Sequence, residues 1–348
     1  MKRTILFLVI LCWLGSAFAY QNVVVYQEAG KFCGWPANNG VWIWGNEILV
    51  GFDYGVYKYN PDGHSIDPNY PSQMVQARSL DGGVTWTLEK PEALKNGVKY
   101  QKSNGAINFT HPDFAMKVRN RKLFYSYNRG KDWEGPVELP AFDQIAINSR
   151  TDYVINSQCE ALIFTSAAKP DGIEDRPLVI KTANGGRTFE FLSWITDCPP
   201  VETGTHSFAT MPSTVKLSDT KYITAIRNRI AKRKWIDICE STDGGASWHF
   251  LSNPVEGQWN PGSMIKLADG RICLTYGYRS APIGIRAKIS DDNGKTWGSE
   301  IILRDGGLGW DMGYPRTVQR PDGKIVTMYY FYTESNPQQH IAATIWQP

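Results

Sequence analysis

An eight-residue motif repeats along the chain and constrains the fold more than any other feature. Its copies are SLDGGVTW from Ser79, STDGGASW from Ser241 and SDDNGKTW from Ser290, with a weaker copy, TANGGRTF, from Thr182. The Asp or Asn at the third position can accept hydrogen bonds from backbone N–H groups ahead of it, and the Gly at the fifth position permits the positive φ of a tight turn. The closing aromatic side chain can bury a large apolar area against neighbouring strands. The repetition therefore predicts a protein built from similar β-units.

Runs of alternating apolar residues around polar turns predict β-hairpins between the motifs. Clear examples are residues 214–217 with 222–226, 264–267 with 272–276, and 317–319 with 325–330. Each later unit has room for this hairpin, a third strand that ends at the motif, and a fourth strand after it. Four antiparallel strands in roughly 50 residues are typical of a propeller blade. We therefore expect an all-β fold, a six-bladed β-propeller with four-stranded antiparallel blades.

Two blades are expected to depart from the regular pattern. The last blade, from Tyr314 to Pro348, has no motif, so its outer strand is predicted to be Val23 to Tyr26, which would close the ring and remove an exposed edge. The segment 108–140 is expected to form blade two. Its run SYNRGKDW, 126–133, resembles the motif but follows the turn at Asn120 too closely, so we interpret it as a second strand with its exit loop.

The N-terminus has the pattern of a cleavable export signal. Lys2 and Arg3 precede the apolar run from Ile5 to Leu14, and Ala17-Phe18-Ala19 follows as a small-residue cleavage site. The apolar run is too short to span a bilayer. We expect residues 1–19 to be a signal peptide, residues 20–348 to form a single propeller domain without a membrane span, and the protein to be secreted or periplasmic.

Composition bounds the partners and cofactors. Without Lys2 and Arg3, 35 basic residues would face 34 acidic ones, which argues against nucleic acid as a partner. The sequence has no metal-ligand spacing and no dinucleotide or phosphate loop, so we expect neither a metal nor another cofactor. The five mature cysteines include no close pair, which argues against a disulfide framework, although a Cys33–Cys198 bridge stays open. We expect a monomer.

The export signal, the motifs and the six predicted blades together resemble the sialidase (neuraminidase) superfamily over essentially the whole mature chain. The run 313–316 (GYPR), followed by 321–323 (PDG), is similar to the start of that family's last blade, which carries a Tyr nucleophile. Arg227 and Arg279 resemble the second and third of three arginines that hold a carboxylate. The first arginine belongs to an Arg-Ile-Pro run in that family, and the matching stretch here is Gly34-Trp35-Pro36, which has no arginine. The Glu that assists the Tyr would fall near Met211. The resemblance thus implies a divergent branch.

The order of the strands predicts where the site lies. Residues that enter first strands or leave second strands should share the face opposite the motifs, where propellers commonly carry function. By this rule Asp113 and Arg129 also belong to that mouth. The resemblance implies that Tyr314 is the nucleophile, and Asp53, His64 and Asp67 compete for the acid/base role. The residues expected to bind substrate are Trp35, Asn38, Arg150, Asp152, His206, Arg227, Arg279 and Arg316.

These residue types indicate the chemistry. A phenol titrates near 10, so a Tyr nucleophile needs cations beside it, and planar guanidinium groups also bind carboxylates well. We expect an exported, exo-acting glycan-degrading enzyme of sialidase-like type. It would be a glycoside hydrolase that cleaves a terminal acidic (sialic or uronic) or deoxy sugar. A polysaccharide or oligosaccharide lyase on the same fold, and a non-catalytic glycan-binding propeller, are the alternatives.

Overall fold

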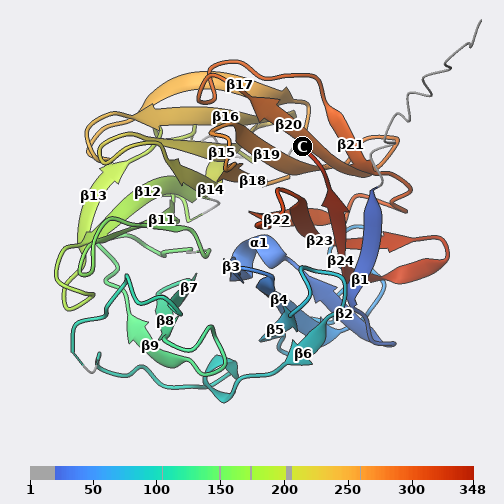
Figure 1. Cartoon of the computed structure of the whole chain (residues 1–348), viewed down its shortest axis with the longest axis horizontal. Coiled ribbons are helices and arrows are strands. Elements are labelled where there is room, and N and C mark those ends of the chain that lie inside the picture. The colour runs from blue at the N-terminus through green and yellow to red at the C-terminus, as the bar shows by residue number, and fades with distance from the viewer. Residues whose placement is uncertain (1–19, 104, 149, 173–174, 201–205, 259) are drawn as a thin grey trace, which may run out of the picture.

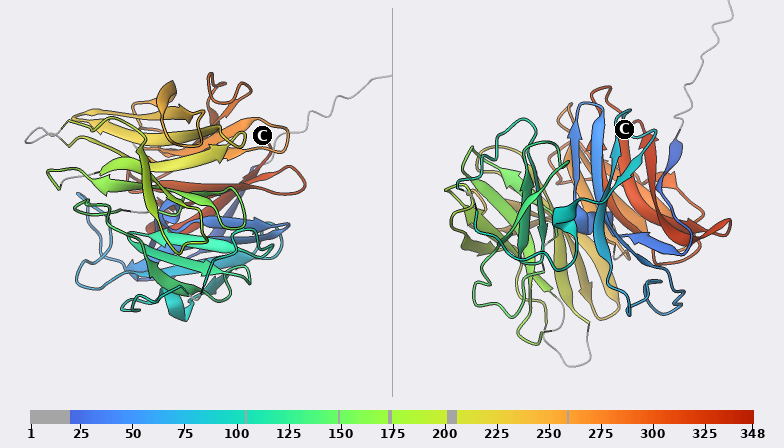
Figure 2. Two further views of the ribbon diagram at one scale, coloured as in Figure 1. Left: turned by 90° about the vertical axis from the view of Figure 1, so that its left-hand side faces the viewer. Right: turned by 90° about the horizontal axis from the view of Figure 1, so that it is seen from below.

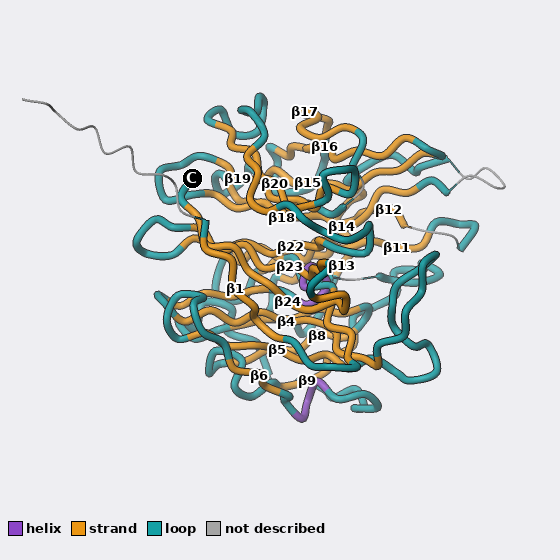
Figure 3. The backbone as a smooth tube through the Cα atoms, turned by 90° about the vertical axis from the view of Figure 1, so that its right-hand side faces the viewer, coloured by secondary structure: helices purple, strands orange, loops and turns teal. Residues whose placement is uncertain are grey.

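Six β-sheets surround a central axis in the computed structural model, as Figure 1 shows. The structure describes residues 20–103, 105–148, 150–172, 175–200, 206–258 and 260–348, so the expected signal peptide lies outside the described residues. Loops project from both faces of the ring (Figure 2). The short helix α1 (Pro36–Asn39) lies near the centre, and a 3₁₀ turn, η1 (Glu92–Leu94), lies at the periphery (Figure 3). The prediction of an all-β, six-bladed propeller is confirmed.

Each blade is an antiparallel sheet, and its strands are numbered here in chain order. Blade one contains β2 (Lys31–Gly34), β3 (Val41–Trp44), β4 (Glu47–Val56), β5 (Gln73–Ser79) and β6 (Thr87–Glu89), and blade two contains β7 (Ala115–Arg119), β8 (Lys122–Ser126) and β9 (Glu134–Glu138). Blade three contains β10 (Tyr153–Ile155), β11 (Ala161–Ala168), β12 (Asp175–Thr182) and β13 (Glu190–Trp194), and blade four contains β14 (Phe208–Lys216), β15 (Tyr222–Ile230), β16 (Arg233–Ser241) and β17 (His249–Glu256). Blade five contains β18 (Gly262–Lys266), β19 (Ile272–Tyr278), β20 (Gly284–Ser290) and β21 (Ile301–Arg304), and blade six contains β22 (Gly313–Gln319), β23 (Ile325–Thr333), β24 (Asn336–Trp346) and β1 (Gln21–Tyr26).

The N-terminal strand closes the ring. β1 pairs antiparallel with β24, with Val23 opposite Ala343, so the outer strand of blade six comes from the start of the chain. Val25 on β1 is buried in the same core cluster as Ile341 and Ile345. This confirms the predicted closure and covers the edge that β24 would otherwise expose.

The repeated motifs form the predicted turns. In the copy from Ser241, the Asp243 carboxylate accepts hydrogen bonds from the Ser247 backbone N–H at 2.9 Å and from the Ser241 hydroxyl at 2.8 Å. The Gly244 N–H donates to the Thr220 carbonyl, in the hairpin between β14 and β15, at 2.8 Å. The motif turns therefore lie on the same face of the ring as the hairpins between first and second strands, as the strand order predicts.

Blade two is where the sequence interpretation was wrong. The segment 126–133 is a true motif turn, because the Gly130 N–H donates to Ser126 Oγ at 2.9 Å and the Asp132 N–H donates to Asn128 Oδ1 at 2.9 Å. It connects β8 to β9, which are the third and fourth positions of a blade. Among the described residues this blade has no inner first strand, so β7 occupies the second position. The turn at Asn120 is therefore the turn between second and third strands, which explains the short spacing.

Two side chains from blade three form hydrogen bonds with backbone groups along the inner edge of β7. Thr151 Oγ1 accepts a hydrogen bond from the Val118 N–H at 3.2 Å and donates to the Val118 carbonyl at 3.2 Å. The Tyr153 hydroxyl oxygen accepts from the Met116 N–H at 3.3 Å. Because unpaired backbone groups are costly when buried, these two hydroxyls stand in for the missing strand.

Because blade two lacks an inner first strand, two residues that were expected at the mouth lie elsewhere. Arg129 Nε lies 2.6 Å from the Asp113 carboxylate, and Arg129 Nη1 lies 2.8 Å from the carboxylate of Glu47. Glu47 begins β4, directly after the turn of the first hairpin of blade one. Asp113 and Arg129 therefore lie on the face that carries the motifs. The expectation that they line the mouth was wrong, because β7 was taken for a first strand.

All five described cysteines are free, so Cys33 and Cys198 do not form a bridge; Cys33 is buried and Cys198 is exposed. Among the described residues, no helix is long and apolar enough to cross a membrane.

Candidate functional site

Three first strands carry an unusual residue directly before a proline. Trp35, Met211 and Tyr314 have positive φ values of 57°, 57° and 48°. The pairing with the second strand shifts register around Met211 and Tyr314, and at Trp35 the first strand is divided into β2 and β3. Non-glycine residues with positive φ are uncommon, and bulges of this kind redirect a side chain. All three pack against one core cluster from blades one, four and six, so the bulges converge in space.

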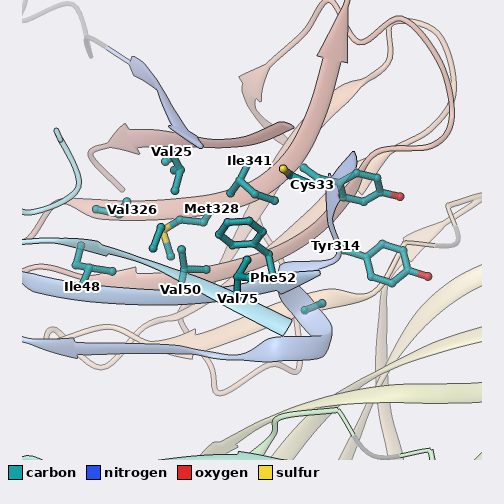
Figure 4. Close-up of a cluster of buried hydrophobic side chains, with 14 of the residues drawn as sticks. Val25, Cys33, Ile48, Val50, Phe52, Val75, Tyr314, Val326, Met328 and Ile341 are labelled. Carbon is teal, nitrogen blue, oxygen red and sulfur yellow. The ribbon is translucent and has the colours of Figure 1, made fainter. Parts of the chain in front are cut away.

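Tyr314 lies at one end of that cluster. Figure 4 shows its ring at the edge of the labelled side chains, with the hydroxyl pointing away from the aliphatic ones. Arg227 Nη1 donates a hydrogen bond to the Tyr314 hydroxyl oxygen at 3.1 Å, and the guanidinium carbon of Arg279 lies 5.6 Å from the ring centroid. Burial of the phenol opposes ionisation, but the charges of Arg227, Arg279 and Arg150 outweigh it and lower the pKa of Tyr314 below its ordinary value. The surroundings therefore make this phenol easier to ionise than an ordinary tyrosine.

Met211 occupies the place where the resemblance puts a Glu. Its sulfur accepts a hydrogen bond from Arg227 Nη1 at 3.5 Å. A thioether carries no charge and cannot take up a proton at neutral pH. This position thus supplies packing for the arginine but no acid or base.

His64 and Asp311 form a close pair across a long separation in sequence. His64 Nδ1 lies 2.5 Å from Asp311 Oδ1; the carboxylate is buried, and the imidazole is 38% exposed. The imidazole ring meets Trp35 edge-on, with centroids 4.9 Å apart, and lies 5.6 Å from the Trp310 ring. A histidine oriented by a buried carboxylate is a common general acid or base.

The Asp311 carboxylate is held by several further donors. Its oxygens accept hydrogen bonds from the Tyr330 hydroxyl at 2.7 Å, Gln339 Nε2 at 3.0 Å and the Ser65 N–H at 3.3 Å. Burial, and then the charge of Asp311, raise the pKa of Tyr330 well above its ordinary value. Tyr330 therefore remains a neutral donor, and the carboxylate that orients His64 is fixed in place.

Arg279 and Trp310 connect this pair to Tyr314. The guanidinium carbon of Arg279 lies 5.5 Å from the Trp310 ring centroid and 5.6 Å from that of Tyr314. Its Nε and Nη2 atoms donate to the Met312 carbonyl at 3.2 and 2.9 Å, which sets the orientation of the guanidinium plane. Phenol, guanidinium, indole and imidazole thus follow one another in a continuous series of contacts.

The two carboxylates proposed for the acid/base role have structural partners. Asp53 is buried, and its Oδ2 accepts from Asn39 Nδ2 at 3.1 Å and pairs with Arg119 Nη2 at 3.2 Å. Asp67 Oδ1 accepts from both the backbone and the side chain of Asn69, at 3.1 and 3.0 Å, as in an Asx turn. The contacts of the third candidate, His64, lead to Tyr314 through Trp310 and Arg279.

The other predicted substrate-binding residues differ in whether their described contacts place them near Tyr314. Arg150 Nε donates to Asn38 Oδ1 at 3.0 Å, and its charge acts on Tyr314, so both lie near the phenol. Arg316 is buried and donates to the carbonyls of Ala37 and Thr151. Burial raises the pKa of Asp152 to about 7, and the charge of Arg316 opposes this shift. His206 is exposed, just before β14 begins.

Three residues of the site were not among the sequence candidates: Trp310, Asp311 and Tyr330. A proline inside a strand pattern is the sequence signal that could have located the three bulges, because proline is rare in the middle of a sheet. No local pattern indicates that His64 meets Asp311. Within the described ranges, no group of three or more His, Cys, Asp or Glu side chains is arranged to hold a metal ion.

Comparisons with known proteins support the fold. Residues 92–327 match the family described as BNR repeat-like domain. Among solved structures, a protein of unknown function from Dyadobacter fermentans is similar, with a TM-score of 0.72 and 22% identity over 94% of this chain and 99% of that chain. The GH93 alpha-L-arabinofuranosidase of Fusarium graminearum gives a TM-score of 0.62 at 11% identity over 93% and 96% of the two chains.

A NanB sialidase variant from Streptococcus pneumoniae gives a TM-score of 0.61 at 12% identity, over 93% of this chain and 70% of that one. No curated protein matches the sequence significantly. These identities establish a shared fold, on which glycoside hydrolases including sialidases and an arabinanase are found.

Proposed function

We propose, since the chain belongs to the BNR repeat-like domain family, that it is an exported glycoside hydrolase that removes a terminal acidic sugar from a glycan. The observation that carries the proposal is the Tyr314 phenol, whose pKa is lowered by Arg227, Arg279 and Arg150. A buried phenol whose ionisation is favoured by neighbouring guanidinium groups has the properties of a nucleophile for an electron-poor anomeric carbon. The glycoside hydrolases among the similar structures support the same reaction class.

The described residues suggest two displacement steps. First, the Tyr314 oxygen bonds to the anomeric carbon while the bond from that carbon to the glycosidic oxygen breaks, and the His64 imidazolium gives its proton to the departing oxygen. Then a water oxygen bonds to the anomeric carbon, the bond to Tyr314 breaks, and His64 takes the proton from the water. Two displacements at one carbon retain its configuration.

The arginines support the choice of an acidic sugar. Arg227 and Arg279 approach Tyr314 together, and their planar guanidinium groups suit a carboxylate close to the reacting carbon. Trp35 and Trp310, on either side of His64, provide apolar surface for the C–H faces of a sugar ring. Carboxyl-reduced substrates should therefore be cleaved more slowly than the acids.

Tyr314→Phe tests the proposal, because it removes only the hydroxyl. On a panel of sialyl, uronyl and rhamnosyl glycosides, we expect kcat to fall by at least about 100-fold, with retained anomeric configuration in the wild-type product by NMR. Tyr329→Phe is the matched control, since Tyr329 is a buried phenol of the same blade that bonds to Thr344. Full activity of Tyr314→Phe would overturn the assignment, and glycan binding without cleavage would favour a binding module.

A lyase is the second candidate, and the observation in its favour is that the uncharged Met211 lies where the resemblance puts a Glu, while His64 is oriented by Asp311. In this reaction the arginines neutralise a uronate carboxylate and the Tyr314 phenolate takes the proton from the adjacent carbon. A C=C bond forms as the C–O bond to the leaving group breaks, and His64 protonates the departing oxygen.

Heavy-oxygen water separates the two reactions. Hydrolysis places the heavy oxygen on the anomeric carbon of the released sugar. Elimination consumes no water and yields an unsaturated product that absorbs in the ultraviolet. Mass spectrometry of the product therefore decides between hydrolase and lyase without any variant of the protein.

A further inference from the structure

A groove separate from the Tyr314 site lies between blades three and four. It encloses a cavity of about 590 Å³, a size usual for small-molecule and oligosaccharide ligands. We call it the interblade groove and define it by Arg176, Trp194, Cys198, Phe208, Asp237 and Phe250, which line it together with neighbouring residues. None of the residues predicted from the sequence to bind substrate lines this cavity.

The lining combines aromatic surface with fixed hydrogen-bonding groups. The guanidinium carbon of Arg176 lies 4.3 Å from the Trp194 ring centroid, and Arg176 Nε donates to the Thr196 carbonyl at 2.9 Å, which hold that indole in place. Asp237 Oδ2 accepts from Trp235 Nε1 at 2.6 Å. A ligand suited to this lining presents apolar C–H faces to the aromatic rings and hydroxyl groups to the polar atoms, as saccharide units do.

The charges in the groove indicate a neutral ligand. Among its lining residues, one arginine, Arg176, stands against two carboxylates, Asp197 and Asp237, so the lining has no surplus of positive charge. A polyanion such as a nucleic acid or an acidic peptide would need a surplus of positive charge. This differs from the neighbourhood of Tyr314, where three arginines act on one phenol.

One arginine links the groove to the reacting phenol. Phe208 lines the groove, and the guanidinium carbon of Arg227 lies 4.9 Å from its ring centroid. The same guanidinium donates to the Tyr314 hydroxyl oxygen at 3.1 Å. The groove lining and the Tyr314 hydroxyl thus contact the same buried arginine, so the two places lie within the length of a few sugar units of each other.

We propose that the interblade groove binds the neutral, hydroxyl-rich saccharide units that continue beyond the cleaved linkage. This inference rests on the proposed function, because it assigns the groove to the same glycan. It makes the protein selective for chain length and for uncharged sugars next to the terminal acidic one.

Cys198 allows a test that does not depend on activity, because it is exposed in the groove whereas Cys33, Cys239 and Cys273 are buried. The rate of Cys198 alkylation by N-ethylmaleimide is followed by mass spectrometry, with and without neutral glucan, xylan, arabinan and galactan fragments of three to five units. A fragment present at about ten times its Kd should slow labelling by about tenfold.

Two variants and a control sharpen the result. Trp194→Ala and Phe250→Ala should lose the protection; Phe250 is 63% exposed, so its removal should not disturb folding. Ile302→Ala, on the outer strand of blade five and 51% exposed, should keep it. Absence of protection by every fragment, or protection that survives both groove variants, would overturn the proposal.

The outcomes also separate this proposal from the proposed function. Cleavage of the acidic panel without protection of Cys198 would refute the groove and leave the hydrolase intact. Protection without any cleavage would refute the hydrolase and leave the groove as a glycan site. If both hold, Phe250→Ala should raise KM for long substrates and leave kcat on short aryl glycosides unchanged.

Discussion

At the Tyr314 hydroxyl, one guanidinium group supplies both a hydrogen bond and the leading favourable charge. Arg227→Met removes both, while burial of the phenol remains, so the pKa of Tyr314 should rise. Loss of a charge-assisted hydrogen bond is worth about 1.5–3 kcal/mol, which corresponds to about one to two pKa units. Because the phenolate is the reactive form, the limb on which kcat/KM rises with pH should move to higher pH by that amount.

Spectrophotometric titration checks the same shift without substrate, with Tyr314→Phe used to assign the phenolate signal. Arg233→Met is the control, since Arg233 is exposed and pairs with Glu256 in the same blade. An unchanged titration in Arg227→Met would show that this arginine does not tune the phenol.

A second prediction at the residue scale concerns Lys117 and the pH dependence of stability. Burial lowers its pKa to about 7, although the charge of Asp53 opposes this; its ammonium nitrogen has no hydrogen-bond partner among the described residues. The unfolded chain, with a lysine pKa near 10.4, binds the proton more tightly, so this residue makes the protein more stable as pH rises from about 7 to about 10. The difference amounts to at most about 4 kcal/mol.

Lys117→Met should remove that dependence and should not lower stability at pH 7, because an apolar group replaces an unpaired polar one. Urea denaturation of wild type and variant from pH 7 to 10 measures the difference in slope. Lys99→Met, at an exposed position, should change nothing. Parallel pH profiles for wild type and Lys117→Met would contradict the prediction.

How well the site can be predicted varies residue by residue. Tyr314, Arg227 and Arg279 follow from strand order and the resemblance, and the structure brings all three together. His64 was one of three acid/base candidates, and its partner Asp311 was not foreseen. That contact joins residues on blades one and six, which are far apart in the sequence, so no local sequence pattern could predict it.

At the level of elements, local patterns predict motif turns well, because each turn is held by its own hydrogen bonds, such as those to Asp243. The absence of an inner strand in blade two could not be predicted in the same way. Thr151 and Tyr153, which replace that strand, belong to another blade and resemble ordinary strand residues in the sequence.

Tyr153→Phe tests this replacement. It leaves the Met116 N–H and the Trp42 indole N–H without the acceptor that the hydroxyl oxygen provides at 3.3 and 3.0 Å, which should cost about 1–3 kcal/mol. Hydrogen exchange in β7 should accelerate while exchange in blade five stays unchanged. Tyr222→Phe is the control, because that phenol donates to Asn156 and Asp219 away from β7. Unaltered exchange in β7 would mean that the hydroxyl does not protect this edge.

At the scale of the whole molecule, closure of the ring connects the N-terminus to the candidate site. β1 covers β24, and Val25 packs in the cluster that also contains Tyr314 and Met211. A substitution that disrupts the packing of β1 should therefore also destabilise the centre of the ring, since the cluster is shared by blades one, four and six.

Two neighbouring residues of β1 make this testable within one strand. Val25 is buried and Val24 is 53% exposed, so Val25→Asp places a charge in the core whereas Val24→Asp leaves it in water. Burying an unpaired charge costs several kcal/mol, so Val25→Asp should lower the unfolding midpoint sharply and expose the β24 edge to aggregation. Val24→Asp should match wild type in thermal unfolding and in activity. If adding a synthetic peptide of residues 20–28 to Val25→Asp restores its unfolding midpoint, loss of closure is the cause; equal midpoints for both variants would show that the ring holds without this strand.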